Sequence, residues 1–341
     1  MQTKITLNNI QLLRAIAALL VLLHHALPHY QVMGETLVLI DKVAYWGFMG
    51  VDIFFVISGF IMAYTTFHKP RTLQNSRTFL KHRLFRIYLG YWPFLLFAFL
   101  LFWFTNPAKI PSFDLVGSFF LLNTTMSELL LPISWSLSYE LYFYFLFLFS
   151  FLFSLQQLYR VIPLLTLLIL TLVLIAHSTT LLPSNFFYSP YLLEFFGGVL
   201  LYQFKEYLMR WWVLVLSIVV IVVAYGYGIH YESKNGLYRI LTFGVGAFFL
   251  TLMFLILEQK NIYSANRYAI ALGDASYTLY LSHLIIINLF YFMGFRAFFS
   301  GEGVLLPLLG LCMIIFISIT FSLLYYKYIE KPLYTTAIKG T

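Results

Sequence analysis

The chain contains the uninterrupted apolar stretch Trp211-Trp-Val-Leu-Val-Leu-Ser-Ile-Val-Val-Ile-Val-Val-Ala-Tyr-Gly-Tyr-Gly-Ile229, nineteen residues without a charged side chain. At about 1.5 Å of rise per residue, such a helix is roughly 28 Å long, close to the roughly 30 Å hydrocarbon core of a bilayer. The whole chain shares this character, because 61% of its 341 residues are hydrophobic and only 10% are charged. Soluble domains carry about 25% charged residues. The composition therefore excludes a soluble protein and predicts an integral membrane protein.

Similar apolar runs recur throughout residues 1–341, which we expect to form a single all-α membrane domain of ten transmembrane helices. The tails are too short for a separate catalytic module, so any chemistry is expected within the membrane domain. The final Glu330-Lys331-Pro332 is expected to end the last helix. The spans are expected to begin near Ile10, Ala44, Leu84, Leu137, Val161, Tyr188, Trp211, Leu237, Ala271 and Val304.

The net charge of +8 is explained by where the basic residues lie. With a cytoplasmic N-terminus, sixteen of the 21 Lys and Arg residues fall on the inner side, as the positive-inside rule requires. Both termini are therefore expected in the cytoplasm, and no nucleic-acid partner is expected. The single Cys312 excludes an intramolecular disulfide and a thiolate cluster, and no metal is expected. The basic residues on the outer side are Lys42, Lys109, Lys234, Arg239 and Arg296.

Ionisable side chains inside the spans are candidates for function, because an unpaired charge in a bilayer costs several kcal/mol. Asp52 and Glu140 are expected in the outer halves of two inward-running spans, at the level reached by His25 on the first span. These three side chains therefore predict a cluster near the outer surface. The full set is Arg14, His24, His25, Asp52, Glu140, Glu194, Asp274 and His283.

Arg14 and His25 are expected to share one face of the first helix. Eleven residues at about 100° each bring them within roughly 20° of each other around the axis, about 16 Å apart along it. His24 is rotated away by about 80°. We therefore expect His25, rather than His24, to act together with Arg14.

Two basic residues, Arg83 and Arg86, are three positions apart and therefore neighbours on a helix surface. They have two readings, which the sequence leaves open. One is a contact with lipid headgroups that fixes topology. The other is a phosphate site on the cytoplasmic face, because the guanidinium group matches phosphate geometry.

Seven short strings occur in order along nearly the whole chain. They are Gln11-Leu-Leu-Arg14-Ala-Ile-Ala-Ala18, Gly50-Val-Asp-Ile-Phe-Phe-Val-Ile-Ser-Gly-Phe60, Arg83-Leu-Phe-Arg86-Ile87, Trp135-Ser-Leu-Ser-Tyr-Glu140, Glu194-Phe-Phe-Gly-Gly198, Ser276-Tyr-Thr-Leu-Tyr-Leu-Ser-His283 and Ile329-Glu330-Lys-Pro332. Together they resemble the multi-span membrane acyltransferases called acyltransferase family 3, of the O-antigen and exopolysaccharide type. The chain departs from the usual pattern in having His82-Arg83 in place of paired arginines, and in lacking a proline near Leu89. No appended SGNH-type esterase domain is expected.

The resemblance implies an enzyme of the bacterial inner membrane. Such an enzyme transfers an acyl group, usually acetyl, from cytoplasmic acyl-coenzyme A to a sugar hydroxyl of an exported polysaccharide, lipopolysaccharide or lipid-linked precursor. The acceptor, the acyl group and the oligomeric state stay open, and the alternative is a transporter or flippase of a lipid-linked saccharide.

The resemblance also implies roles for individual residues. His25 is the expected general base or acyl-accepting nucleophile, with Glu140 or Asp52 as the carboxylate that orients it. The remaining residues are expected in two further groups: Arg14, Arg83 and Arg86 bind the coenzyme A phosphates, and Trp135, Ser58 and His283 contact substrate or serve packing.

Overall fold

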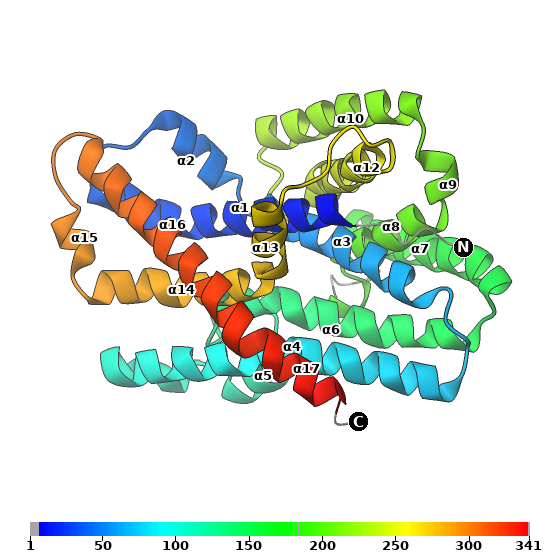
Figure 1. The fold of residues 1–341 in the computed structure, drawn as a ribbon, viewed down its shortest axis with the longest axis horizontal. Coiled ribbons are helices and arrows are strands. Elements are labelled where there is room, and N and C mark those ends of the chain that lie inside the picture. Colours follow the sequence, from blue (N-terminus) through cyan, green and yellow to red (C-terminus); the bar gives the residue numbers. More distant parts are fainter. Residues whose placement is uncertain (1–6, 180, 183–184, 340–341) are drawn as a thin grey trace. The chain divides into compact units, whose positions relative to one another are not determined.

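The computed structural model describes residues 7–179, 181–182 and 185–339. This described part consists of helices and the segments that connect them, without a β-strand (Figure 1). Eight helical segments within it are long and apolar enough to cross a bilayer. They are α1 (Asn8–Met33), α3 (Met49–Thr66), α4 (Leu73–Thr105), Pro132–Leu152 around α6 (Trp135–Leu148), α7 (Leu155–Ser178), α10 (Trp211–His230), Gly236–Gln259 ending in α12 (Val245–Gln259), and Leu305–Ile338 beginning with α16 (Leu305–Tyr325).

A ninth segment is bent, because α13 (Arg267–Asp274) and α14 (Ser276–Phe292) meet at 66°. The tenth expected span, near Tyr188, is α8 (Tyr191–Gln203), whose thirteen residues make a helix of about 20 Å, short of the roughly 30 Å core. The prediction of an all-α membrane protein is confirmed, whereas the count of ten spans is not. The cytoplasmic location of both termini stays a prediction.

The last helix does not end at Glu330-Lys331-Pro332, so that expectation is wrong. The helical path runs from α16 through a π-helical turn, Tyr326–Glu330, into α17 (Lys331–Lys339). Pro332 is the second residue of α17. A proline inside a continuous helical path removes one backbone N–H donor, and helices depart from regular α geometry at prolines and at π-helical turns, as this path does directly before Pro332.

The chain forms two compact units, whose boundaries fall inside helices. Of the described residues, those within 1–14, 51–81 and 142–270 form unit 1, and those within 15–50, 82–141 and 271–341 form unit 2. The expectation of a single membrane domain stays a prediction, and each unit is described by itself.

Unit 1 is built around α8, which packs against α7 and α12, while α10 packs against α12 (Figure 1). Helix α8 also meets α3 at backbone contact. A Cβ atom at Gly198 would lie 2.0 Å from the carbonyl oxygen of Val56, and one at Gly59 would lie 1.8 Å from that of Phe195. Small residues are what allow two membrane helices to approach this closely. Two of the seven strings thus meet here, one from each helix.

Unit 2 is built around α14, which is buried along most of its length and packs against α16. Glycines again bring backbones together, because a Cβ atom at Gly47 would lie 2.1 Å from the carbonyl oxygen of Leu20. The short helix α5 (Leu115–Phe120) is fastened to α4 by Tyr91, whose hydroxyl donates to the carbonyl oxygen of Ser118 at 2.7 Å. Cys312 is exposed on α16.

The contact between α3 and α8 generates a prediction with a neighbouring control. Gly198→Ala places a methyl group against the Val56 carbonyl and is expected to destabilise the protein by about 1–3 kcal/mol, the usual range for overpacking. Gly197→Ala adds the same atom 3.6 Å from Phe248, at ordinary contact distance, and is expected to be neutral. Thermal unfolding in detergent micelles measures both. Equal melting temperatures for the two variants would contradict the close contact.

Candidate active site

His25 lies on α1 in unit 2 and is partly buried. Its Nδ1 atom is 2.9 Å from the carbonyl oxygen of Val21, one turn earlier on the same helix. A carbonyl oxygen only accepts hydrogen bonds, so Nδ1 is the protonated nitrogen of the neutral ring. The lone pair is therefore on Nε2, which is the nitrogen able to take a proton.

His283, on α14 in the same unit, contacts His25. Its Nε2 atom lies 3.1 Å from His25 Nδ1, and the two ring centres are 4.9 Å apart. His283 is fully buried. The adjacent His24 engages a different group, because its Nδ1 atom is 3.0 Å from the carbonyl oxygen of Ala44. The two neighbouring histidines of α1 thus have separate environments.

The start of α6 is fastened to α14 beside this pair. The hydroxyl of Tyr280 donates to the carbonyl oxygen of Ile133 at 2.9 Å and lies 2.7 Å from the hydroxyl of Ser136. Trp135, which directly precedes Ser136, is only 7% exposed and packs inside the protein. Glu140 is half-buried on the same helix. The strings that contain Glu140 and His283 therefore meet in unit 2.

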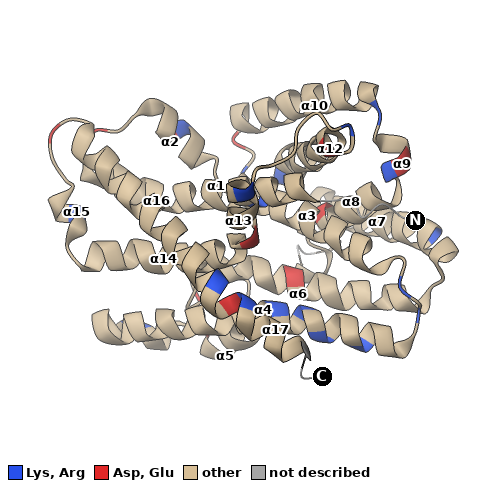
Figure 2. Ribbon diagram, in the orientation of Figure 1, with Lys and Arg blue, Asp and Glu red and all other residues tan. Residues whose placement is uncertain are grey.

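Arg86 ties three elements of unit 2 together. Its Nη1 atom lies 2.5 Å from a carboxylate oxygen of Glu330, and its guanidinium group lies 5.0 Å from the ring centre of Tyr277. Thr278 donates to the other oxygen of Glu330. The Glu330 side chain is 4% exposed and the Arg86 side chain 25% exposed, so the carboxylate is buried and the guanidinium group is partly exposed. Arg83 is half-buried on α4, where Figure 2 shows basic residues along the first half of the helix.

In unit 1, Asp52 forms a buried, two-bond ion pair. Arg239 donates from Nε to Oδ1 and from Nη2 to Oδ2, each at 2.8 Å. Asp52 is 0% and Arg239 6% exposed. The ring of Tyr191 lies under the guanidinium group, 5.3 Å from it. Such a planar, bidentate pair is the strongest form of arginine–carboxylate contact.

Glu194 adds a second acid to this part of unit 1. It is 3% exposed, and neither of its carboxylate oxygens has a hydrogen-bond partner among the described residues. One of these oxygens lies against Gly244, where a Cβ atom would be only 2.6 Å away. Gly244 ends a π-helical turn, Ile240–Gly244, that directly follows Arg239. Turns of this kind occur most often at functional sites.

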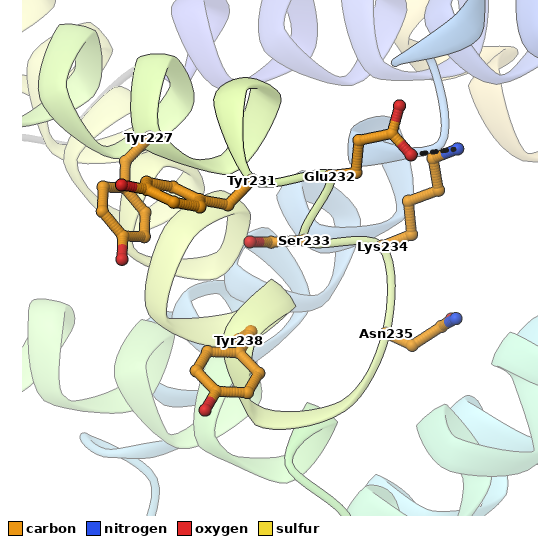
Figure 3. Close-up of a pocket in the computed structure, with 7 residues that line it drawn as sticks. All are labelled: Tyr227, Tyr231, Glu232, Ser233, Lys234, Asn235 and Tyr238. Carbon is orange, nitrogen blue, oxygen red and sulfur yellow. Dashed lines mark ion pairs between the residues drawn. The ribbon is translucent and has the colours of Figure 1, made fainter.

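A cavity of about 390 Å³ lies elsewhere in unit 1, around the turn after α10 (Figure 3). Its three tyrosines are 53–61% exposed, and Lys234 pairs with Glu232 at 3.8 Å. Exposed tyrosines are typical of a membrane–water interface. The cavity therefore adds no residue to the candidate site. Its lining consists of Tyr227, Tyr231, Glu232, Ser233, Lys234, Asn235 and Tyr238.

Comparison with known families gives one match: the model described as an acyltransferase domain covers residues 7–327. The chain belongs to acyltransferase family 3. It is thus a multi-pass membrane protein and a transferase of acyl groups. No curated protein and no solved structure matches the chain significantly.

Within the acyltransferase, the structure joins some of the expected site residues to partners. His25 contacts His283, Arg86 is paired with Glu330, and Asp52 is paired with Arg239. Arg14 contacts a neighbour on its own helix, because its Nη1 atom donates to the side-chain oxygen of Gln11 at 3.0 Å. Ser58 is half-buried on α3. The catalytic and phosphate-binding roles of these residues stay predictions.

The sequence analysis did not identify Arg239 as a site residue and only counted it among the basic residues on the outer side of the acyltransferase. The position of Arg239 could have indicated a buried role. Arg239 opens an apolar segment on the side that the positive-inside rule leaves poor in basic residues. A basic residue in that position needs a buried acid, and Asp52 supplies it.

The Asp52–Arg239 pair predicts a double-mutant result. Asp52→Asn leaves a buried guanidinium without its counter-charge and is expected to destabilise the acyltransferase by about 3–5 kcal/mol. Removing both charges in Asp52→Asn/Arg239→Gln is expected to cost less than the sum of the single changes, because no charge is left alone. Unfolding in mixed micelles measures the cycle.

The exposed Glu232–Lys234 pair is the matched control for this cycle. Glu232→Gln is expected to change the free energy of unfolding by about 1 kcal/mol or less, because water screens an exposed pair. Additive effects of the Asp52 and Arg239 changes would show that the buried pair is not coupled.

Proposed function

We propose that this acyltransferase moves an acetyl group from cytoplasmic acetyl-coenzyme A to a hydroxyl of a saccharide. The acceptor is an exported polysaccharide or its lipid-linked precursor, and the enzyme works in the bacterial inner membrane. One observation carries the proposal: inside a membrane acyltransferase, a partly buried histidine has its Nδ1 atom hydrogen-bonded to a backbone carbonyl, which leaves the lone pair of the neutral ring on Nε2. That arrangement is the one a general base needs.

The reaction requires a base because a sugar hydroxyl is a weak nucleophile. In the proposed step, the hydroxyl oxygen bonds to the acyl carbon while the bond from that carbon to the thioester sulfur breaks. His25 Nε2 takes the hydroxyl proton and then returns it to the departing thiolate, so coenzyme A leaves as the thiol. A positioned base contributes about 10²- to 10⁴-fold to such a step.

Binding of the donor phosphates is assigned to arginines. The chemistry of α4 fits this role, because Arg83 and Arg86 are adjacent on a helix surface and guanidinium groups match phosphate oxygens in pairs. We assign phosphate binding to both arginines, and the contact of Arg86 with Glu330 also positions α4 in this proposal. Arg14, eleven residues before His25 on α1, supplies a further cation in this proposal.

The two acids receive different roles. Glu140 is the carboxylate proposed to face the acceptor or the imidazolium, since its string meets that of His283 in unit 2. Both oxygens of Asp52 accept hydrogen bonds from Arg239, so we assign Asp52 to holding α3 within unit 1. Trp135 and Ser58 are assigned to packing around the substrates.

A His25 variant tests the proposed reaction. His25→Ala in lipid nanodiscs is expected to lower kcat by about 10²-fold or more, because the base is lost. Labelled acetyl-coenzyme A and a panel of glycans provide the substrates, and size-exclusion chromatography checks folding. Full activity of a folded variant would remove His25 from the mechanism. Movement of the saccharide across the membrane without acylation would instead favour the flippase.

An Arg83 variant tests the phosphate assignment. Arg83→Ala is expected to weaken acetyl-coenzyme A binding by about 10-fold or more, the usual loss for a hydrogen bond to a charged group. The control is Arg77→Ala, which removes an exposed charge from the same helix and is expected to leave affinity nearly unchanged. Calorimetry measures both, and equal affinities would contradict the assignment.

A further inference from the structure

We propose that His283 is the positioning residue of His25. In this proposal, which rests on the proposed function, a buried neutral imidazole accepts the His25 Nδ1 proton. It thereby does the work that a carboxylate does in a serine-hydrolase triad. In this proposal, the side chain in direct contact with the base is that of His283, and not that of Asp52 or Glu140.

The proton positions follow from three distances. His283 Nδ1 lies 3.2 Å from the carbonyl oxygen of Leu279, an acceptor, so this nitrogen carries the proton. Its Nε2 atom therefore has a lone pair and faces His25 Nδ1 at 3.1 Å. His25 Nδ1 also faces the Val21 carbonyl at 2.9 Å, so its single proton is shared between two acceptors.

The reverse arrangements are unfavourable. A proton on His283 Nε2 would require a lone pair on His25 Nδ1, which would then face the lone pairs of the Val21 oxygen. A doubly protonated His283 meets the same conflict and adds a fully buried cation, which is costly without a counter-charge. Among the states in which both rings are neutral, only the one with both protons on Nδ1 satisfies every contact.

This arrangement acts when His25 becomes charged. On taking the substrate proton at Nε2, His25 becomes an imidazolium, and its Nδ1–H becomes a stronger donor. The hydrogen bond from His25 to His283 then strengthens. His283 is 0% exposed, and the low dielectric constant of a buried site makes such a hydrogen bond stronger than it would be in water. Tyr280 lies one turn before His283 on α14. Its hydroxyl donates to the carbonyl oxygen of Ile133, just before α6, and so holds α14, the helix that carries His283, in place.

The resting protein gives a test that is independent of turnover. Purified protein labelled with ¹⁵N-histidine is expected to show Nδ1–H tautomers for His25 and His283 and a coupling across the hydrogen bond between them. Single His→Gln variants assign the signals. An Nε2–H tautomer at His25, or no coupling, would overturn the proposal. Because this readout needs no acyl transfer, it also separates a failure here from a failure of the proposed function.

Kinetics give the second test. His283→Leu removes the acceptor and is expected to lower kcat by about 10²-fold while the KM for acetyl-coenzyme A changes by less than about twofold. His283→Gln keeps an oxygen able to accept near the position of Nε2 and is expected to recover at least about tenfold of that loss. Wild-type kcat in His283→Leu, or a Gln variant no better than Leu, would contradict the positioning role.

Ser282→Ala is the matched control. Ser282 precedes His283 on α14, is 1% exposed, and its hydroxyl has no hydrogen-bond partner among the described residues. The kcat of the Ser282→Ala variant is expected to equal that of the wild type. If His283→Leu does not fold, the Gln variant and the ¹⁵N spectra still decide the question.

Discussion

A charge or an unpaired polar group in a bilayer interior is so unfavourable that it must find a partner within the protein. This constraint explains the buried ion pair of unit 1 and the ion pair of unit 2. In unit 1, the Asp52 carboxylate and the Arg239 guanidinium neutralise each other. In unit 2, Arg86 and Glu330 do the same across α4 and the helical path after α16. His25 and His283 have no ion-pair partner of this kind in the described part of the chain. As neutral rings, they donate from Nδ1 to the backbone carbonyl oxygens of Val21 and Leu279.

Close helix contact is the second element of the design, and glycine makes it possible. The backbones of α3 and α8 touch through Gly59 and Gly198, each of which leaves no room for a Cβ atom. These glycines come from the same strings as Asp52 and Glu194. The strings therefore encode packing and charge together: the glycines bring the helices close, and the acids lie on the helices that are brought close.

The membrane character, most span positions and the family could be predicted from the sequence, because apolar runs and ordered strings are local features. The pairing of Arg239 with Asp52, and of Arg86 with Glu330, could not be, since the partners are 187 and 244 residues apart. The count of ten spans is not confirmed, because α8 is shorter than the hydrocarbon core of a bilayer. His283 was recognised as a candidate, but its contact with His25 depends on how α1 and α14 pack.

The hydrogen bond from His25 to the Val21 carbonyl has a further consequence for the order of events. Val21 belongs to the same helix, so the tautomer of His25 is set as soon as α1 forms. Neither substrate has to rotate the ring or move a proton to make Nε2 basic. In the proposed mechanism, the basic Nε2 atom is therefore available before either substrate binds, so the placement of the proton imposes no order on the binding of donor and acceptor.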